Sequence, residues 1–192
     1  MTPEQLEEIK KRQKQAEEIT KGVRLEWDVK PGGGDHLALS YSVRHEGEAA
    51  VYLLDRVVVF APKEGFEEAP DRIIALAEDD PETLTLSRGW VRPPWSNVMY
   101  ELMPGARRLE PGGTLQGHAQ IPLPLQPWHP NEGARPFDAP PRKMVLRMGL
   151  LPTFCELQEL RLNEGSTVQV PKGADAYLYQ QWLTSEPRPI PG

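Results

Sequence analysis

Histidines and carboxylates are the side chains of this sequence best suited to metal binding or proton transfer. The histidines are His36, His45, His118 and His129. None of them forms a spaced pair such as HxH or HExxH, so the sequence contains no local metal-binding motif. A hydrolase or metal-dependent site built from distant strands would combine His118 and His129 with Asp35 or Asp138. Histidines without a spaced partner are usually solvated or structural, so the sequence assigns no catalytic residue, no metal ligand and no cofactor.

A turn rich in acidic residues is a second candidate set of ligands. Its carboxylates belong to Glu78, Asp79, Asp80 and Glu82. The turn lacks the alternate-residue ligand spacing and the central glycine of a dedicated calcium-binding loop. A solvated turn therefore explains this cluster better than a calcium site does.

Large aromatic residues are concentrated in two proline-rich stretches, residues 90–100 and 122–141. The predicted binding residues are Trp90, Trp95, Tyr100, Trp128 and Phe137. Prolines bar these stretches from a central strand, so backbone pairing does not explain the aromatic side chains. On loops, such side chains can form a recognition patch for a peptide, a sugar ring or another protein. The alternative is that they pack against the open end of the domain and order its long connections.

Strands must position these side chains, and the clearest strand pattern runs from Asp35 to Phe60. Leu37, Leu39, Tyr41 and Val43 alternate with polar and small residues, which predicts a strand with one apolar face. Residues 45–48 predict a polar turn, followed by a second, adjacent strand that is apolar on both faces. Further strands are predicted at residues 23–30, 72–77, 83–86, 97–103, 106–109, 114–123, 143–151, 166–170 and 176–183.

The two ends of the chain differ from this β pattern. Residues 2–21 predict a helix that begins with the capping-box residues Thr2 and Gln5. Its narrow apolar stripe either docks on the same domain or pairs with a partner or a second copy. The proline-rich C-terminal end contains no expected core residue, and we predict that it forms a free tail. The expected organisation is a helix at residues 1–22, a β-sandwich domain at residues 23–184 and a tail at residues 185–192.

Composition limits the class of protein. The chain has 192 residues, of which 21 are proline and 16 are glycine, and this is typical of a turn-rich, mainly β domain. Its net charge of −6 opposes binding to phosphate backbones, so nucleic acid is not an expected partner. The absence of a long apolar run and of a secretory signal indicates a soluble, cytoplasmic protein without a membrane span. A mature chain that had lost a signal peptide would look the same. The single cysteine, Cys155, is expected to be a buried hydrophobe.

Three short segments resemble the immunoglobulin-like β-sandwiches of bacterial accessory domains, a group that includes intracellular proteinase inhibitors. The segments are Leu39–Glu48, Val51–Leu53 and Leu109–Leu115, which together give strand, polar turn, strand and a later Pro-Gly turn before another strand. The resemblance implies a mainly β fold: a single immunoglobulin-like antiparallel β-sandwich with an N-terminal α-helix and a long Pro-rich connection. It implies architecture alone and carries over no functional residue.

The leading functional expectation is a non-catalytic module that binds a protein partner through its aromatic and proline-rich loops. Surface loops on a stable scaffold are where such folds acquire function. Two alternatives remain: a hydrolase-type enzyme with a site assembled from distant strands, and a carbohydrate-binding module in which aromatic rings stack on sugar faces. The sequence does not indicate the oligomeric state.

Overall fold

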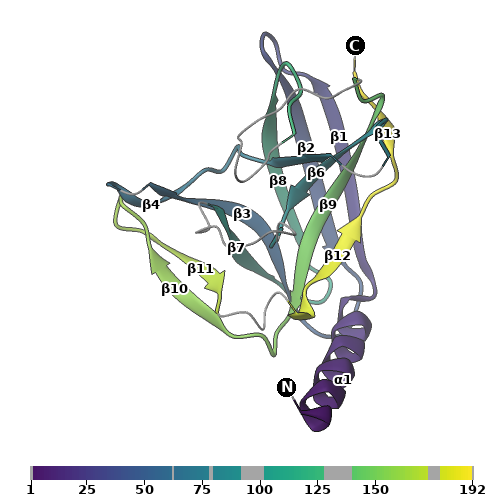
Figure 1. Cartoon of the computed structure of the whole chain (residues 1–192), viewed down its shortest axis with the longest axis vertical. Coiled ribbons are helices and arrows are strands. Elements are labelled where there is room, and N and C mark those ends of the chain that lie inside the picture. The colour runs from purple at the N-terminus through teal and green to yellow at the C-terminus, as the bar shows by residue number, and fades with distance from the viewer. Residues whose placement is uncertain are drawn as a thin grey trace.

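The computed structural model describes residues 2–61, 63–77, 80–91, 102–127, 140–172 and 178–191. The chain is mainly β, as predicted, and the described residues form one helix and thirteen strands (Figure 1). In chain order these elements are α1 (Pro3–Thr20), β1 (Val23–Pro31), β2 (His36–His45), β3 (Val51–Ala61), β4 (Gly65–Glu68), β5 (Ile74–Ala77), β6 (Thr83–Arg88), β7 (Leu102–Leu109), β8 (Thr114–Pro122), β9 (Lys143–Pro152), β10 (Leu157–Arg161), β11 (Thr167–Pro171), β12 (Gln181–Thr184) and β13 (Arg188–Pro189).

The smaller of two sheets contains three antiparallel strands in the order β1-β2-β8. Alternation decides its faces, because successive side chains of a strand point to opposite sides. Leu37, Leu39, Tyr41 and Val43 of β2 are all buried, whereas Ala38 and Ser40 are exposed. The apolar face predicted for this strand is therefore confirmed.

The larger sheet branches at β9. Its ten strands follow the order β10-β11-β7-β3-β9-β6-β5, with β12 and β13 also paired to β9 and β4 paired to β3. Met148 of β9 pairs with Arg88 and with Leu183, and Leu150 pairs with Leu53 and with Gln181. Strands β6 and β3 therefore lie end to end along one side of β9, opposite β12 and β13. Strand β6 runs parallel to β9, so the prediction of an entirely antiparallel sandwich is wrong at this pair.

The turn after β2 does not form a hairpin. Among the described residues, β2 pairs with β1 and β8, whereas β3 pairs with β4, β7 and β9 of the other sheet. The prediction of two adjacent strands is wrong because the turn at residues 46–50 carries the chain from one layer to the other. His45, predicted in the polar turn, ends β2 and is fully buried, where its ring bonds to the Ala49 carbonyl and the Gly47 amide.

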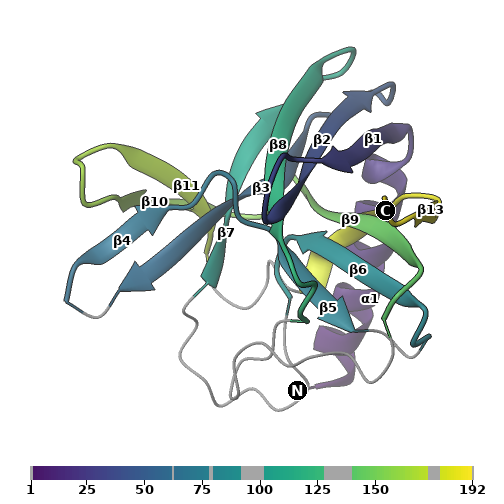
Figure 2. The same ribbon diagram turned by 90° about the horizontal axis from the view of Figure 1, so that it is seen from above.

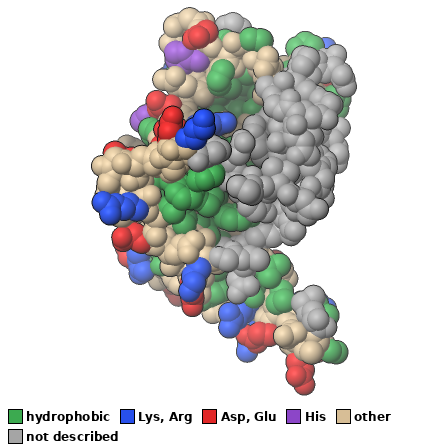
Figure 3. All heavy atoms as spheres, turned by 60° about the vertical axis from the view of Figure 1, so that its left-hand side comes forward, with side chains coloured by type: hydrophobic (Ala, Val, Ile, Leu, Met, Phe, Trp, Pro, Cys, Tyr) green, Lys and Arg blue, Asp and Glu red, His purple; other side chains and the backbone are tan. Residues whose placement is uncertain are grey.

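The two sheets face each other across a shared apolar core, and Figure 2 shows β1, β2 and β8 over β9 and β6. The largest core cluster takes side chains from both layers, including Leu39 and Tyr41 of the small sheet and Leu53, Leu86 and Leu146 of the large one. A separate cluster lies under β4, β10 and β11. On the side of the molecule that carries these strands, hydrophobic side chains gather between charged ones (Figure 3).

Helix α1 begins at the predicted capping box, in which Thr2 and Gln5 each bond to the other's backbone. Its C-terminal half docks on the same chain, with Ala16 fully buried in a cluster that also contains Cys155. Its N-terminal half extends away from the sheets, and Leu6 is exposed (Figure 1). Cys155 is buried, as expected. No helix in the described part of the chain combines the length and apolar character that a membrane crossing requires.

The C-terminal segment is attached to the core. Arg188 and Pro189 pair with Met144 and Lys143 of β9, and Ile190 packs against the largest core cluster. The prediction that this tail lacks core residues is therefore wrong. A proline can be accommodated in β13 because, within the described ranges, this strand lies at the margin of the sheet and pairs on one side, with β9.

Candidate functional site

A buried polar network occupies the place where β3 and β6 separate from β9. Its four side chains are those of Tyr41, Asp55, Arg88 and Arg107. Asp55 and Arg88 are 2% and 3% exposed, respectively. Asp55 lies where the register between β3 and β7 shifts between Leu53 and Arg56, so an irregularity in the ladder aims its carboxylate into the core.

Arg88 donates to backbone carbonyl groups of both sheets and of residues 70–72. Its Nη1 donates to the Asp55 carbonyl at 2.7 Å and to the Tyr41 hydroxyl at 2.9 Å. Its other donors reach carbonyl oxygens of Pro70 at 2.6 Å, Arg72 at 3.1 Å and His118 at 2.9 Å. A guanidinium presents its donors in a planar fork, and here that fork joins both sheets to residues 70–72.

The Asp55 carboxylate is held by two partners. Tyr41 Oη donates to Asp55 Oδ2 at 2.9 Å, and Arg107 Nε donates to Asp55 Oδ1 at 2.9 Å while Arg107 Nη2 bonds to Oδ2. Burial, followed by the negative charge of Asp55, raises the pKa of Tyr41 to about 12. The donors of Arg88 are directed at backbone carbonyls and at Tyr41, so this network fits a structural role better than a catalytic one.

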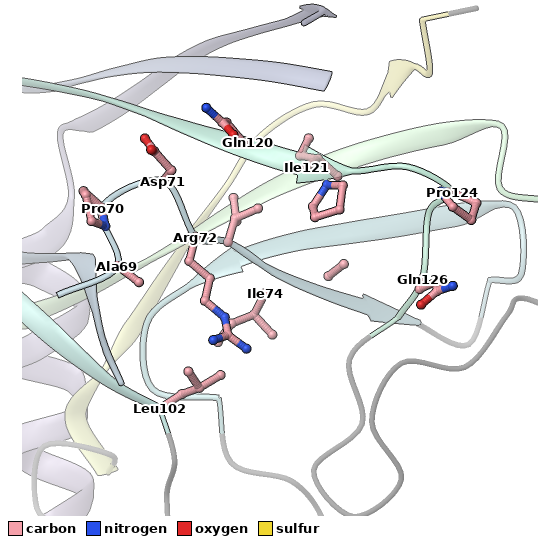
Figure 4. A pocket seen from close by; sticks show the side chains of 13 residues that line it. Ala69, Pro70, Asp71, Arg72, Ile74, Leu102, Gln120, Ile121, Pro124 and Gln126 are labelled. Atoms are coloured by element: carbon pink, nitrogen blue, oxygen red, sulfur yellow. The ribbon is translucent and has the colours of Figure 1, made fainter. Parts of the chain in front are cut away.

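An apolar groove lies beside this network and is lined in part by Pro70 and Arg72, whose carbonyls Arg88 binds (Figure 4). It has a volume of about 590 Å³, within the range of about 300–1,000 Å³ typical of ligand sites. Its lining comes from the segment before β5, from β5 itself, from the end of β8 and the turn after it, and from the first residue of β7. These residues are Ala69, Pro70, Asp71, Arg72, Ile73, Ile74, Ala75, Leu102, Gln120, Ile121, Pro122, Pro124 and Gln126.

The wall formed by residues 69–73 has little freedom to move. The Ala69 amide donates to the Val57 carbonyl, and the Gln120 amide donates to the Asp71 carbonyl, both at 2.8 Å. Arg88 also donates hydrogen bonds to the Pro70 and Arg72 carbonyls of this segment. Ile73 and Ile121 lie in the floor and belong to the largest core cluster. The groove is therefore a preformed feature of the fold.

Two charged residues of the wall have different surroundings. Asp71 Oδ1 lies 3.0 Å from His118 Nε2 on the surface. The Arg72 side chain makes neither an ion pair nor a side-chain hydrogen bond with any described residue, although the Arg72 backbone is bonded at both its amide and its carbonyl. Figure 4 shows the Asp71 carboxylate and the Arg72 guanidinium directed to opposite sides, with the guanidinium near Ile74 and Leu102.

Of the predicted aromatic residues, Trp90 falls within the described part of the chain. It follows β6 and is partly buried, and its backbone exchanges hydrogen bonds with the Gln180 side chain at 2.7 Å and 3.3 Å. It does not line the groove. Trp95, Tyr100, Trp128 and Phe137 lie outside the described residues, so the aromatic patch stays a prediction.

The described members of the predicted histidine and aspartate set lie apart from one another. His118 pairs with Asp71 instead of Asp35. The β2–β8 register places Asp35 about five residues, or about 17 Å, along the strands from His118. His129 and Asp138 lie outside the described residues. Within the described ranges, no three His, Cys, Asp or Glu side chains gather closely enough to hold a metal ion.

Half of the acidic turn is described, and there Asp80 has protein partners. Its carboxylate accepts from the Glu82 amide at 3.0 Å and the Thr83 hydroxyl at 2.7 Å, and it pairs with Lys143 at 3.0 Å. The bonds from Thr83 and Lys143 lower the pKa of Asp80 to about 2. This geometry is that of a turn that leads the chain into β6. Glu78 and Asp79 lie outside the described residues.

Reasoning from the sequence missed the groove. A weak local signal exists, because Pro70, Pro122 and Pro124 flank two short apolar runs and prolines mark sheet edges. That signal does not show that residues 69–75 and 120–126 face each other. Pairing across the two layers decides this, and it depends on contacts between residues about 50 positions apart.

Comparison with family models, with curated proteins and with solved structures gives no match for this chain. The functional conclusion therefore depends on the geometry of the groove.

Proposed function

We propose that this protein is a non-catalytic protein-interaction module whose binding face is the groove between β5 and β8. The observation that carries the proposal is the groove itself, which is concave, mostly apolar and framed by fixed backbone. Concave apolar sites with a few polar groups are the usual form of binding sites in proteins. A preformed site binds more tightly because little ordering accompanies association.

The architecture supports the same reading. Two facing sheets that share a core are compatible with the proposed likeness to immunoglobulin-like accessory domains. The parallel β6–β9 pair and helix α1 depart from that simple pattern. The binding face proposed for this chain is therefore the groove, carried by a layered β scaffold.

The predicted aromatic residues belong to neighbouring parts of the sequence. Tyr100 precedes the groove residue Leu102 by two positions, and Trp128 follows the groove residue Gln126 by two positions. The groove and the predicted aromatic patch are thus proposed to serve one interaction.

A peptide-display selection tests this function. The full chain would be used to select peptides from a random library of 12-residue sequences, with binding then measured by fluorescence anisotropy. Ala75→Arg places a large charged side chain in the groove, and Gln126→Arg does so at an exposed position that the core does not depend on. Gln158→Arg adds the same side chain on the exposed surface of β10 as a control.

We expect selected peptides to bind the unaltered chain and the Gln158→Arg variant equally. Each groove variant should weaken binding by about 10-fold or more, which corresponds to about 1.4 kcal/mol. Circular dichroism and thermal unfolding would verify that the variants fold. Failure to enrich any peptide, or equal binding by both groove variants and the control, would overturn the proposal.

A further inference from the structure

We propose that the partner adds an extended segment as a new strand along the free edge of β5, and that this segment carries a carboxylate opposite Arg72. The inference rests on the proposed function and specifies how the groove recognises its partner. Strand addition to an exposed sheet edge is a common mode of peptide recognition, in which backbone bonds give affinity and side-chain pockets give specificity.

The free edge of β5 is the first observation. Residues Ile74–Ala77 pair with β6 on one side, and β5 is the terminal strand of the large sheet. In the described part of the chain, no backbone hydrogen bond connects the other side of β5 to another element. Unpaired amide and carbonyl groups in a row form a template for a further strand.

The opposing edge, on β8, is not open in the same way. Arg107 binds the Gln116 carbonyl at 3.0 Å, Arg88 binds the His118 carbonyl at 2.9 Å, and the Gln120 amide donates to Asp71 at 2.8 Å. These three residues alternate along β8, so each already has one backbone group bonded on the outward side of the strand. A strand that enters the groove therefore finds its hydrogen-bonding partners on β5.

The positive charge of Arg72 indicates which charged group the partner segment carries. Arg72 stands immediately before Ile73 and β5, its side chain lines the groove, and it pairs with no described acid. A guanidinium beside apolar surface favours a carboxylate, which it can bind through two parallel hydrogen bonds. The other charged wall residue, Asp71, already pairs with His118.

These observations define the occupant as an extended peptide with apolar side chains at alternate positions. The apolar side chains face the groove, while the peptide backbone pairs with β5. An Asp, a Glu or a terminal carboxylate lies at the end of the segment nearest Arg72.

The first test examines the backbone of the tightest 12-residue peptide from the display selection. Each amide of that peptide would be N-methylated in turn, and binding to the full chain measured by anisotropy. We expect losses of about 10-fold or more at alternate positions of one stretch, with the intervening positions tolerated, because a strand faces its neighbour with every second residue. Amide hydrogen exchange at residues 74–77 should slow on binding.

The second test examines the charge. Arg72→Gln should weaken binding about 10-fold, and replacing the peptide carboxylate by the amide should have no further effect in that variant. Arg161→Gln removes an exposed arginine on β10 and should leave binding unchanged.

The outcomes separate the two proposals. If the peptide binds and the groove variants abolish binding, but the N-methyl series shows no alternation, the groove is an interaction site and strand addition is wrong. If alternation occurs while Arg72→Gln binds normally, the carboxylate assignment is wrong. If the groove variants and the control bind alike, both proposals fail together.

Discussion

Arg88 shows how one side chain can hold a branched sheet together. Strands β3 and β6 leave β9 on the same side, and Arg88, the last residue of β6, lies at this point. A buried carbonyl without a donor costs about 1–3 kcal/mol. Arg88 donates to four carbonyl groups, in a buried bond to that of Asp55 and in part-buried bonds to those of Pro70, Arg72 and His118. Its positive charge is offset nearby by Asp55, which lies in the same network.

Replacing Arg88 with Met should lower the free energy of unfolding by about 3–5 kcal/mol, because the Tyr41–Asp55 network loses a cation and four carbonyls, one of them buried, lose their donor. Urea unfolding followed by circular dichroism measures this loss. Arg161→Met on the exposed surface serves as the control and should change stability by less than about 0.5 kcal/mol. Equal stability of the two variants would contradict the structural role of Arg88.

Tyr41 gives the network a dependence on alkaline pH. Its folded-state pKa of about 12 lies above the ordinary value of 10.0, so folding favours the neutral phenol. The stabilisation from this residue is complete below pH 10 and is lost as pH rises from about 10 to about 12, since the unfolded state releases the proton first. Spectrophotometric tyrosine titration should show one of five ionisations near pH 12, absent in Tyr41→Phe. Ionisation of all five tyrosines near pH 10 in the folded protein would contradict this environment.

At the scale of elements, side-chain alternation identified strands more reliably than it identified their partners. Strand β2 has the buried and exposed faces that its sequence predicts. Its neighbours are β1 and β8, while β3 lies in the other layer. A turn sequence does not distinguish a hairpin from a crossing between layers, because both need only a short reversal of the chain.

Adjacent positions of β2 provide a matched test of its faces. Leu39 is 1% exposed, and Leu39→Asp should cost several kcal/mol because it buries a carboxylate without a partner. Ala38 is exposed on the other face, so Ala38→Asp should change the free energy of unfolding by less than about 0.5 kcal/mol. Comparable unfolding midpoints in urea for these two variants would show that the buried face is assigned incorrectly.

At the scale of the whole molecule, the C-terminal segment joins the two layers. Arg188 lies 5.5 Å from the Trp27 ring centroid and 3.5 Å from Asp28 of β1, while its backbone pairs with Met144 of β9. Ile190 adds apolar contact to the core between the sheets. The segment therefore connects the outer strand of the small sheet to the central strand of the large one.

Deleting residues 186–192 should lower the free energy of unfolding by about 1–3 kcal/mol, because β9 loses β13 and the core loses Ile190. Arg188→Gln alone should cost less than about 1 kcal/mol, since it removes only an exposed cation–π contact and a surface ion pair. Thermal unfolding of the three proteins measures the order. If the truncated chain were as stable as the intact one, the C-terminal segment would be a free tail and its attachment to the core would be refuted.

The sequence by itself determined the mainly β class, the helix with its capping box, and most strands, because propensity, capping and two-residue alternation act over a few neighbouring residues. It also indicated correctly that Cys155 is buried. Tertiary structure alone decided the crossing from β2 to β3, the parallel β6–β9 pair and the role of Arg88, and it created the groove beside β5. Each of these depends on contacts between residues far apart in the chain. Propensity, capping and alternation are local, so they do not determine which distant strands pair.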